Sequence, residues 1–164
     1  MKQPPLFASL LRSARPVVGM MCLVGALTSC GRNAADHVRK GDAYVAQQRF
    51  AEAVLEYRAA LQKNPKLGDV RLKLGDTYMR QRDLKNALAE YVRAADLLPN
   101  DASAQLKAGH LLAFARQFQD ARARADRALA IDPKNADAQV LLGNVLAGLK
   151  DFDDAISEYQ TAIA

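Results

Sequence analysis

Apolar residues along most of the chain recur at helical spacing, and the pattern restarts every 34 residues. In the second unit, Val70, Leu74 and Tyr78 are four residues apart, which places them on one face of a helix. The polar run 81–83 then interrupts the stripe, and a second apolar stripe begins at Leu84. The pattern predicts a helix, a short turn and a second helix in each unit.

Small residues and prolines occupy fixed places in this period. Glycine and alanine allow two helices to approach closely, where a larger side chain would hold them apart. Proline ends each of the first three units because it has no amide proton for a continuing helix. We expect the following residues to pack the repeats: Gly41, Ala53, Ala60, Pro65, Gly75, Ala87, Ala94, Pro99, Gly109, Ala121, Ala128, Pro133, Gly143, Ala155 and Ala162.

The period divides the body of the chain into units of one supersecondary structure each. A single unit of two helices cannot bury its apolar face alone, so such units stack on one another. A period of this length therefore predicts an all-α solenoid, which is a binding scaffold. The units are residues 34–67, 68–101, 102–135 and 136–164, of which the last is incomplete.

The composition agrees with closely packed helices and gives little support to nucleic-acid binding. Half of the residues are hydrophobic, only 6% are aromatic and none is tryptophan. Lys2, Arg12 and Arg15 precede residue 30 without any acidic residue, so they account for most of the net charge of +5. Of the 23 basic residues, 20 then remain against 18 acidic ones, and they form no cluster.

The first 29 residues have the parts of a secretory signal. A positively charged run, 1–15, is followed by the apolar stretch 17–27 and then by small and polar residues. The apolar stretch has about eleven residues, whereas a membrane-spanning helix needs about 20. Residues 1–29 are therefore predicted to be a leader that is removed.

The residues Leu27-Thr28-Ser29-Cys30 resemble the lipobox of bacterial lipoproteins. The resemblance implies that the signal is cut before Cys30, that Cys30 carries the lipid, and that residues 30–33 form a short linker. Gly31 stands where an Asp often retains such proteins in the inner membrane, which favours the outer membrane, facing the periplasm. Two alternatives remain open, namely ordinary secretion with an unmodified cysteine, and an uncleaved anchor.

The units of 34 residues resemble the tetratricopeptide repeat family in their glycine, alanine and proline columns and in the large apolar residues that begin the second helices, namely Phe50, Leu84, Phe118 and Phe152. The resemblance implies a right-handed α-solenoid of about four helix-turn-helix repeats. Ala125 stands where the other units have tyrosine, so repeat three is expected to be the loosest. The usual tryptophan of the first helix is replaced by His37, Arg71, Gln105 and Gln139.

In this family the first helix of each unit lines a concave face that holds an extended peptide or a helix. Relatives that clamp the carboxylate of chaperone tails use Lys and Asn there, whereas this chain has apolar residues and the acids Asp42 and Asp76. The resemblance thus implies a partner with leucine-like anchors and some Lys or Arg. By position, the groove residues are Val38, Asp42, Val45, Leu72, Asp76, Met79, Arg80, Leu106, His110, Ala113, Phe114, Val140, Asn144 and Ala147.

The sequence contains no evident catalytic or metal-binding constellation. His37 and His110 lie in different units, without another His or Cys at ligand spacing. The glycines follow the packing period rather than a phosphate-binding loop. Asp151, Asp153 and Asp154 fit a turn before a helix better than a calcium loop. We therefore expect a non-enzymatic protein without a cofactor or metal.

The sequence is interpreted as a lipid-anchored scaffold for other proteins of the bacterial cell envelope, which would bind through peptide or helix segments. The last unit is expected to present a partly open apolar end, formed by Val140, Leu141, Val145, Ile156 and Ile163. Two alternatives follow from that end. The chain forms homo-oligomers through it, or it is the N-terminal part of a longer protein of secretion, pilus assembly, polysaccharide export or catalysis.

Overall fold

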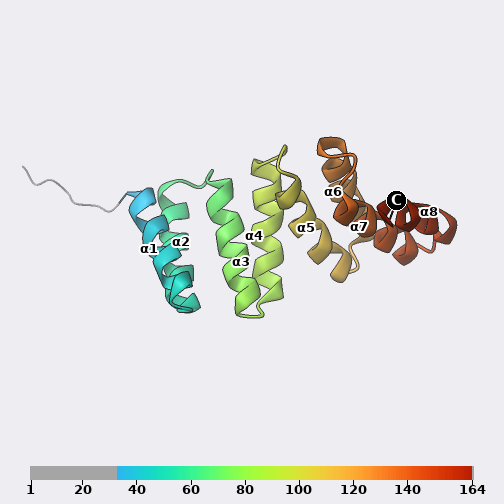
Figure 1. Ribbon diagram of the computed structural model, residues 1–164. Coiled ribbons are helices and arrows are strands. Elements are labelled where there is room, and N and C mark those ends of the chain that lie inside the picture. Colours follow the sequence, from blue (N-terminus) through green and yellow to red (C-terminus); the bar gives the residue numbers. More distant parts are fainter. Residues whose placement is uncertain (1–32, 164) are drawn as a thin grey trace, which may run out of the picture. The chain divides into compact units, whose positions relative to one another are not determined.

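The computed structural model describes residues 33–163, which form eight α-helices and no β-strand. The helices succeed one another in chain order as four pairs (Figure 1), which confirms the predicted α-solenoid. The predicted leader and Cys30 lie outside the described residues. The helices are α1 (Ala34–Ala46), α2 (Phe50–Lys63), α3 (Gly68–Arg80), α4 (Leu84–Leu97), α5 (Ala102–Phe114), α6 (Phe118–Ile131), α7 (Ala136–Gly148) and α8 (Phe152–Ile163).

A connection of the same geometry joins the two helices of every pair. Its second residue is left-handed in each case, with φ of 58° at Gln48, 60° at Arg82, 61° at Arg116 and 69° at Lys150. The next amide then donates to the carbonyl five residues back, at 2.9 Å in all four connections. This bond satisfies a carbonyl at the end of the first helix and reverses the chain within one turn.

The glycine column lies where the two helices of a pair touch. A Cβ atom on Gly41 would come within 2.5 Å of the Tyr57 ring, and one on Gly75 would come equally close to the Tyr91 ring. Any larger residue at these two positions would clash with the tyrosine ring that packs there, so glycine is required. Seven residues of the alanine columns are buried, with at most 2% exposure at Ala53, Ala60, Ala87, Ala94, Ala121, Ala128 and Ala155, whereas Ala162 is only partly buried.

The third helix pair, α5 and α6, packs differently from the others. Ala125 stands in α6 where the other second helices have the tyrosine that packs on the glycine. A Cβ atom on Gly109 would lie 2.6 Å from Leu141 Cδ2, so a leucine of α7 takes the place that a tyrosine ring has elsewhere. Leu141 is 1% exposed, and α5 contacts α7 directly. The next repeat therefore fills the space that Ala125 leaves, which argues against the expected looseness of repeat three.

Polar residues of the first helices tie successive repeats together. Arg71 donates from Nη2 to the Pro65 carbonyl at 3.0 Å, and the fully buried Gln105 donates to the Ala95 carbonyl at 2.8 Å. Gln139 donates in the same way to a carbonyl of the preceding turn. One of these acceptors, Ala95, lies in the last turn of a second helix, and the other two lie in the turn that follows one, so each bond joins a first helix to the end of the preceding repeat.

Candidate functional site

A groove lies between α1 and α3, the first helices of the first two repeats. Beside the beginnings of these helices it forms a cavity of about 450 Å³ with mainly apolar walls, and beside their ends a polar cavity of about 260 Å³. Asp42 lines both cavities, so they are parts of one surface. The apolar part is lined by Ala34, Ala35, Val38, Arg39, Asp42, Leu67 and Val70, and the polar part by Asp42, Val45, Tyr57, Lys73, Asp76, Thr77 and Arg80.

Asp42 is held in the middle of the groove by two partners. Its Oδ1 accepts a hydrogen bond from the Tyr57 hydroxyl at 2.7 Å, and its Oδ2 lies 2.7 Å from Lys73 Nζ. Tyr57 comes from α2 and Lys73 from α3, so this cluster joins three helices. Burial raises the pKa of Tyr57, and the bond to Asp42 raises it further, so the hydroxyl remains a donor.

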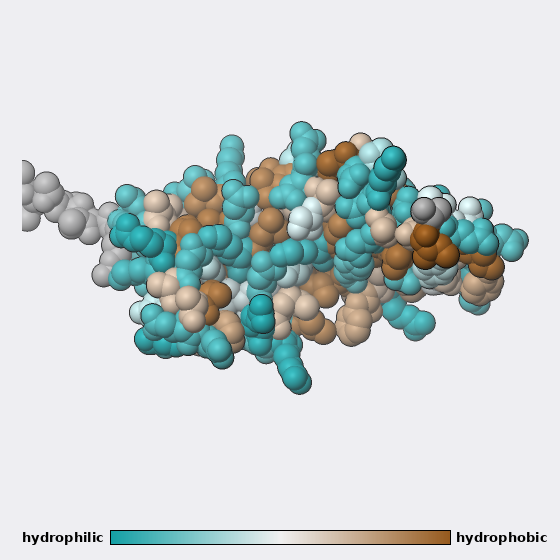
Figure 2. Space-filling view, in the orientation of Figure 1, coloured by the Kyte–Doolittle hydropathy of each residue, from teal (hydrophilic) through white to brown (hydrophobic). Residues whose placement is uncertain are grey.

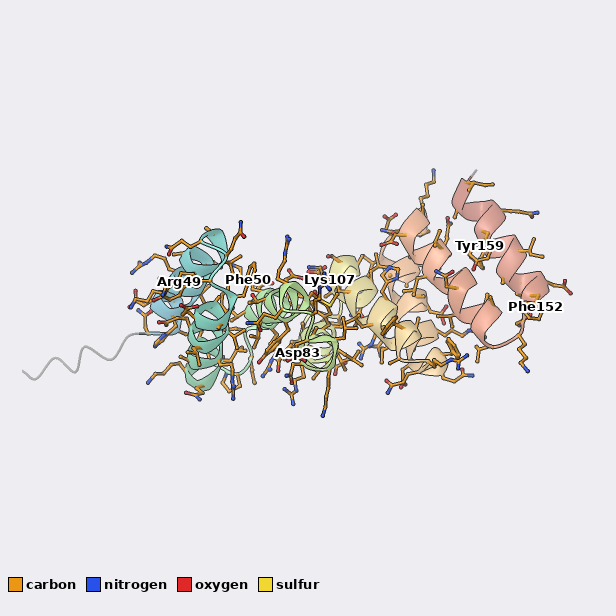
Figure 3. All side chains as sticks on the ribbon, turned by 90° about the horizontal axis from the view of Figure 1, so that it is seen from below. Arg49, Phe50, Asp83, Lys107, Phe152 and Tyr159 are labelled. Carbon is orange, nitrogen blue, oxygen red and sulfur yellow. The ribbon has the colours of Figure 1, made fainter. Side chains whose placement is uncertain are left out.

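The same arrangement recurs one repeat later. Asp76 Oδ1 accepts a hydrogen bond from the Tyr91 hydroxyl at 2.6 Å, and burial followed by this bond raises the pKa of Tyr91. Lys107 of α5 (Figure 3) donates a hydrogen bond to the same carboxylate, and its Nζ lies 5.6 Å from the centroid of the Tyr91 ring. In the fourth repeat, Asn144 accepts from the Tyr159 hydroxyl at 2.9 Å.

These lysines change the electrostatics that the sequence suggests. The sequence predicts acids that are free to attract a basic ligand, whereas each acid is paired with a lysine of the next repeat. In the polar cavity, Asp42 and Asp76 are balanced by Lys73 and Arg80. The expected preference for Lys or Arg in the ligand is therefore not supported by the charges that line the groove.

The groove does not continue in the same form into the third and fourth repeats. His110 occupies the place of the acid, and its Nε2 lies 3.1 Å from Asp137 Oδ1 on α7. Leu106, predicted to line the groove, is only 8% exposed and packs in the same core cluster as Leu141. This corrects its assignment, because a side chain enclosed between repeats offers little surface to a ligand.

The other predicted groove residues differ in accessibility. Val38, Val45 and Arg80 line the cavities between α1 and α3. Leu72 packs against the core between the second and third repeats. Large apolar side chains are partly exposed further along the first helices, with 37% exposure at Met79, 71% at Phe114 and 37% at Val140.

Sequence reasoning missed Tyr57, Lys73 and Thr77 as parts of the polar cavity. A signal for the lysines is nevertheless present. Lys73 follows Asp42 by 31 residues, and Lys107 follows Asp76 by the same interval. The interval is about one helical turn shorter than the period of the repeats. A lysine at this distance from an acid therefore lies on the first helix of the next repeat and faces that acid.

Metal coordination and membrane spanning find no support in residues 33–163. Within this range no three His, Cys, Asp or Glu side chains form a group that could hold a metal ion. None of the helices in the same range combines the length and the apolar character that crossing a membrane requires.

Comparison with known proteins identifies similar repeats and similar structures. Family models match residues 41–82, as TPR repeat, and residues 68–101 and 106–164, as tetratricopeptide repeat. A structure of MamA is 28% identical with a TM-score of 0.70, covering 75% of this chain and 72% of that chain. The structure of YrrB, described as a TPR protein with an unusual peptide-binding site, is 27% identical with a TM-score of 0.71, covering 79% and 67% respectively. A search of curated proteins gave no significant match.

Proposed function

Because the chain belongs to the tetratricopeptide repeat family, we propose that it is a scaffold of the bacterial cell envelope that holds a partner's peptide or helix between α1 and α3. The open groove between these helices carries this proposal. The similarity to YrrB, a repeat protein described as having a peptide-binding site, supports it. Rigid helices place the groove residues in advance, which lowers the ordering cost of binding.

The two parts of the groove suit different parts of one ligand. Val38, Leu67 and Val70 offer an apolar surface for an aliphatic anchor. The polar part offers the carboxylate of Asp42 as acceptor and the ammonium of Lys73 as donor, and each already has a partner. An uncharged ligand segment with amide or hydroxyl groups can donate a hydrogen bond to Asp42 and accept one from Lys73. The backbone of an extended peptide has such groups.

The groove assignment is tested with peptides selected from a random library against the whole repeat array. Peptides that bind in the groove are expected to bind Val38→Glu at least about tenfold more weakly, because a carboxylate in the apolar part must be desolvated. Leu55→Glu is the matched control, since Leu55 is 66% exposed on α2, away from the groove. Fluorescence anisotropy measures both affinities. Equal binding to Val38→Glu and the parent protein would place the peptides elsewhere and reject the groove.

The envelope location rests on the leader and on Cys30. Acylation at Cys30 would fix the groove at a membrane, because two or three buried acyl chains anchor a protein firmly. The test compares intact masses from the membrane fraction for the parent protein and Cys30→Ala. We expect the parent chain to begin at Cys30 with the mass of acyl chains, and the variant to lack that mass. A parent protein that is uncut or unmodified would exclude the lipid anchor and leave the groove proposal standing.

A further inference from the structure

A second groove runs along α4, in the middle of the repeat array. Two cavities of about 400 Å³ and about 270 Å³ lie there and share Leu88, so they form one surface, which we call the α4 groove. Its walls come from α4, α5 and α6, and it shares no lining residue with the groove between α1 and α3. Apolar surface is visible among hydrophilic side chains over this part of the array (Figure 2).

The wall that α4 contributes is a regular apolar stripe. Leu84, Leu88 and Val92 follow one another at intervals of four residues, which places them on one face of the helix. From Leu84 to Asp96, the last residue of α4 in the groove, this wall is about 18 Å long. Leu84 is 37% exposed and Phe114 of α5, which lines the same end, is 71% exposed. Apolar surface of this extent is therefore accessible to a ligand.

The repeat period does not require this apolar wall. One repeat earlier, Arg58 stands at the place of Val92, and Arg80 stands at the place of Phe114. One repeat later, Asp126 stands at the place of Val92. The cavity that α2, α3 and α4 line, of about 220 Å³, accordingly has mainly polar walls. Helices precede and follow the α4 groove on both sides, so its openness does not depend on either end of the chain.

The charges that line the α4 groove leave one lysine without a counter-charge. In the larger cavity two acids and two arginines balance, and Arg124 Nη2 lies 2.8 Å from Asp96 Oδ1. Lys85 is the one charged residue among the described residues that line the smaller, apolar cavity. No ion pair within residues 33–163 includes it. A carboxylate next to an apolar anchor of a ligand would complement this ammonium.

The walls also favour a helical ligand. The three helices bond their backbone groups internally, so they offer few backbone partners to an extended segment. A helix satisfies its own amides and carbonyls and presents only side chains to the groove.

We propose that the α4 groove docks an amphipathic helix of another protein. This helix carries leucine-like residues at intervals of four and an acidic residue beside that stripe. Residues 1–29 of this chain do not fit the description, because they contain no Asp or Glu. The proposal stands independently of the groove between α1 and α3.

The test uses the full-length chain and two helix-stabilised peptides long enough to span the wall of α4. Both peptides carry leucines at intervals of four and neutral residues elsewhere. One has Glu at both ends of the leucine stripe, so that either orientation brings a carboxylate to Lys85, and the other has Lys at these places. The Glu peptide is expected to bind at least about threefold more tightly, with a smaller preference at high salt. Fluorescence anisotropy measures both affinities.

Two substitutions locate the binding, and a third is the control. Val92→Gln copies Gln160, which stands at this place in the fourth repeat, so the fold should tolerate it, as circular dichroism checks. It should weaken both peptides at least about fivefold, because apolar contact is lost. Lys85→Gln should remove the preference between the peptides. Leu55→Gln, at a leucine of α2 that is 66% exposed and outside the groove, should leave both affinities unchanged.

The possible outcomes either support or overturn the proposal. Preferential binding of the Glu peptide, weakened by Val92→Gln and made unselective by Lys85→Gln, supports it. Equal binding of the two peptides, or affinities that Val92→Gln leaves unchanged, would overturn it. Absence of binding by both peptides would also overturn it, as expected if a further segment of the same chain covers the groove. A free protein that sediments as a dimer, and as a monomer after Val92→Gln, would show that a second copy occupies the groove instead.

Discussion

Leu141→Ala is expected to lower the free energy of unfolding by about 3–4 kcal/mol, the middle of the range for a buried leucine. Leu141 is 1% exposed and packs on Gly109 in the space that a tyrosine ring fills in the other three repeats. Ala125 has no side chain that could move into the resulting cavity. The loss should appear as a lower urea midpoint, measured by circular dichroism.

Leu55→Ala is the matched control for this change. Leu55 is 66% exposed on α2, so its truncation removes little buried surface and should cost less than about 0.5 kcal/mol. A cost for Leu141→Ala no greater than that of the control would mean that the third and fourth repeats are not joined by this leucine. Repeat three would then be as loose as its sequence suggests.

The sequence predicts the helices and turns well because every repeat carries the same local sequence pattern. The glycine, alanine and proline columns, the polar connections and the apolar stripes all restart with one period, so four copies support each inference. The pairing of Gly41 with Tyr57 illustrates this, since both positions recur at constant separation. Residues at equivalent positions of successive repeats make the same contact inside each repeat. Such positions therefore predict the contacts within one repeat reliably.

Contacts between repeats are harder to read from such columns. Ala125 suggests a gap as long as only its own unit is considered, whereas the residue that fills the gap, Leu141, belongs to the next one. Asp42 likewise resembles a free acid until Lys73 of the next repeat is placed beside it. The fold is thus set by repeated local patterns, whereas the charge and the extent of the groove depend on single residues that cross a repeat boundary.

The two ends of the repeat array also differ for a reason that lies outside the period. In α1, Asp36 and Lys40 stand at the positions of the apolar Val70 and Leu74 of α3, so the corresponding face of the first repeat is polar. Ile156 and Ile163 keep the apolar pattern at the outer face of α8. In repeat arrays the terminal repeats usually carry a polar outer face, which α1 has and α8 lacks.

The second large effect concerns Glu90, the most enclosed carboxylate of the described residues. Glu90 is 9% exposed, and its two oxygens each accept a hydrogen bond at 2.7 Å, from Arg71 and from Arg93. Glu90→Ala is expected to cost about 2–4 kcal/mol, because it leaves the guanidinium of Arg71, whose side chain is 15% exposed, without its counter-charge. Urea unfolding measures this cost.

Two further variants decide whether this cost comes from the stranded guanidinium or from lost packing. Glu52→Ala removes a carboxylate from an exposed pair with Arg49 and should leave the urea midpoint nearly unchanged, because exposed ion pairs contribute little to stability. The double variant Arg71→Met with Glu90→Leu removes both charges and keeps their volume. It should be clearly more stable than Glu90→Ala alone, since no charge is then enclosed without a partner. If the double variant is as unstable as the single one, the ion pair itself, and not the stranded charge, stabilises the second repeat.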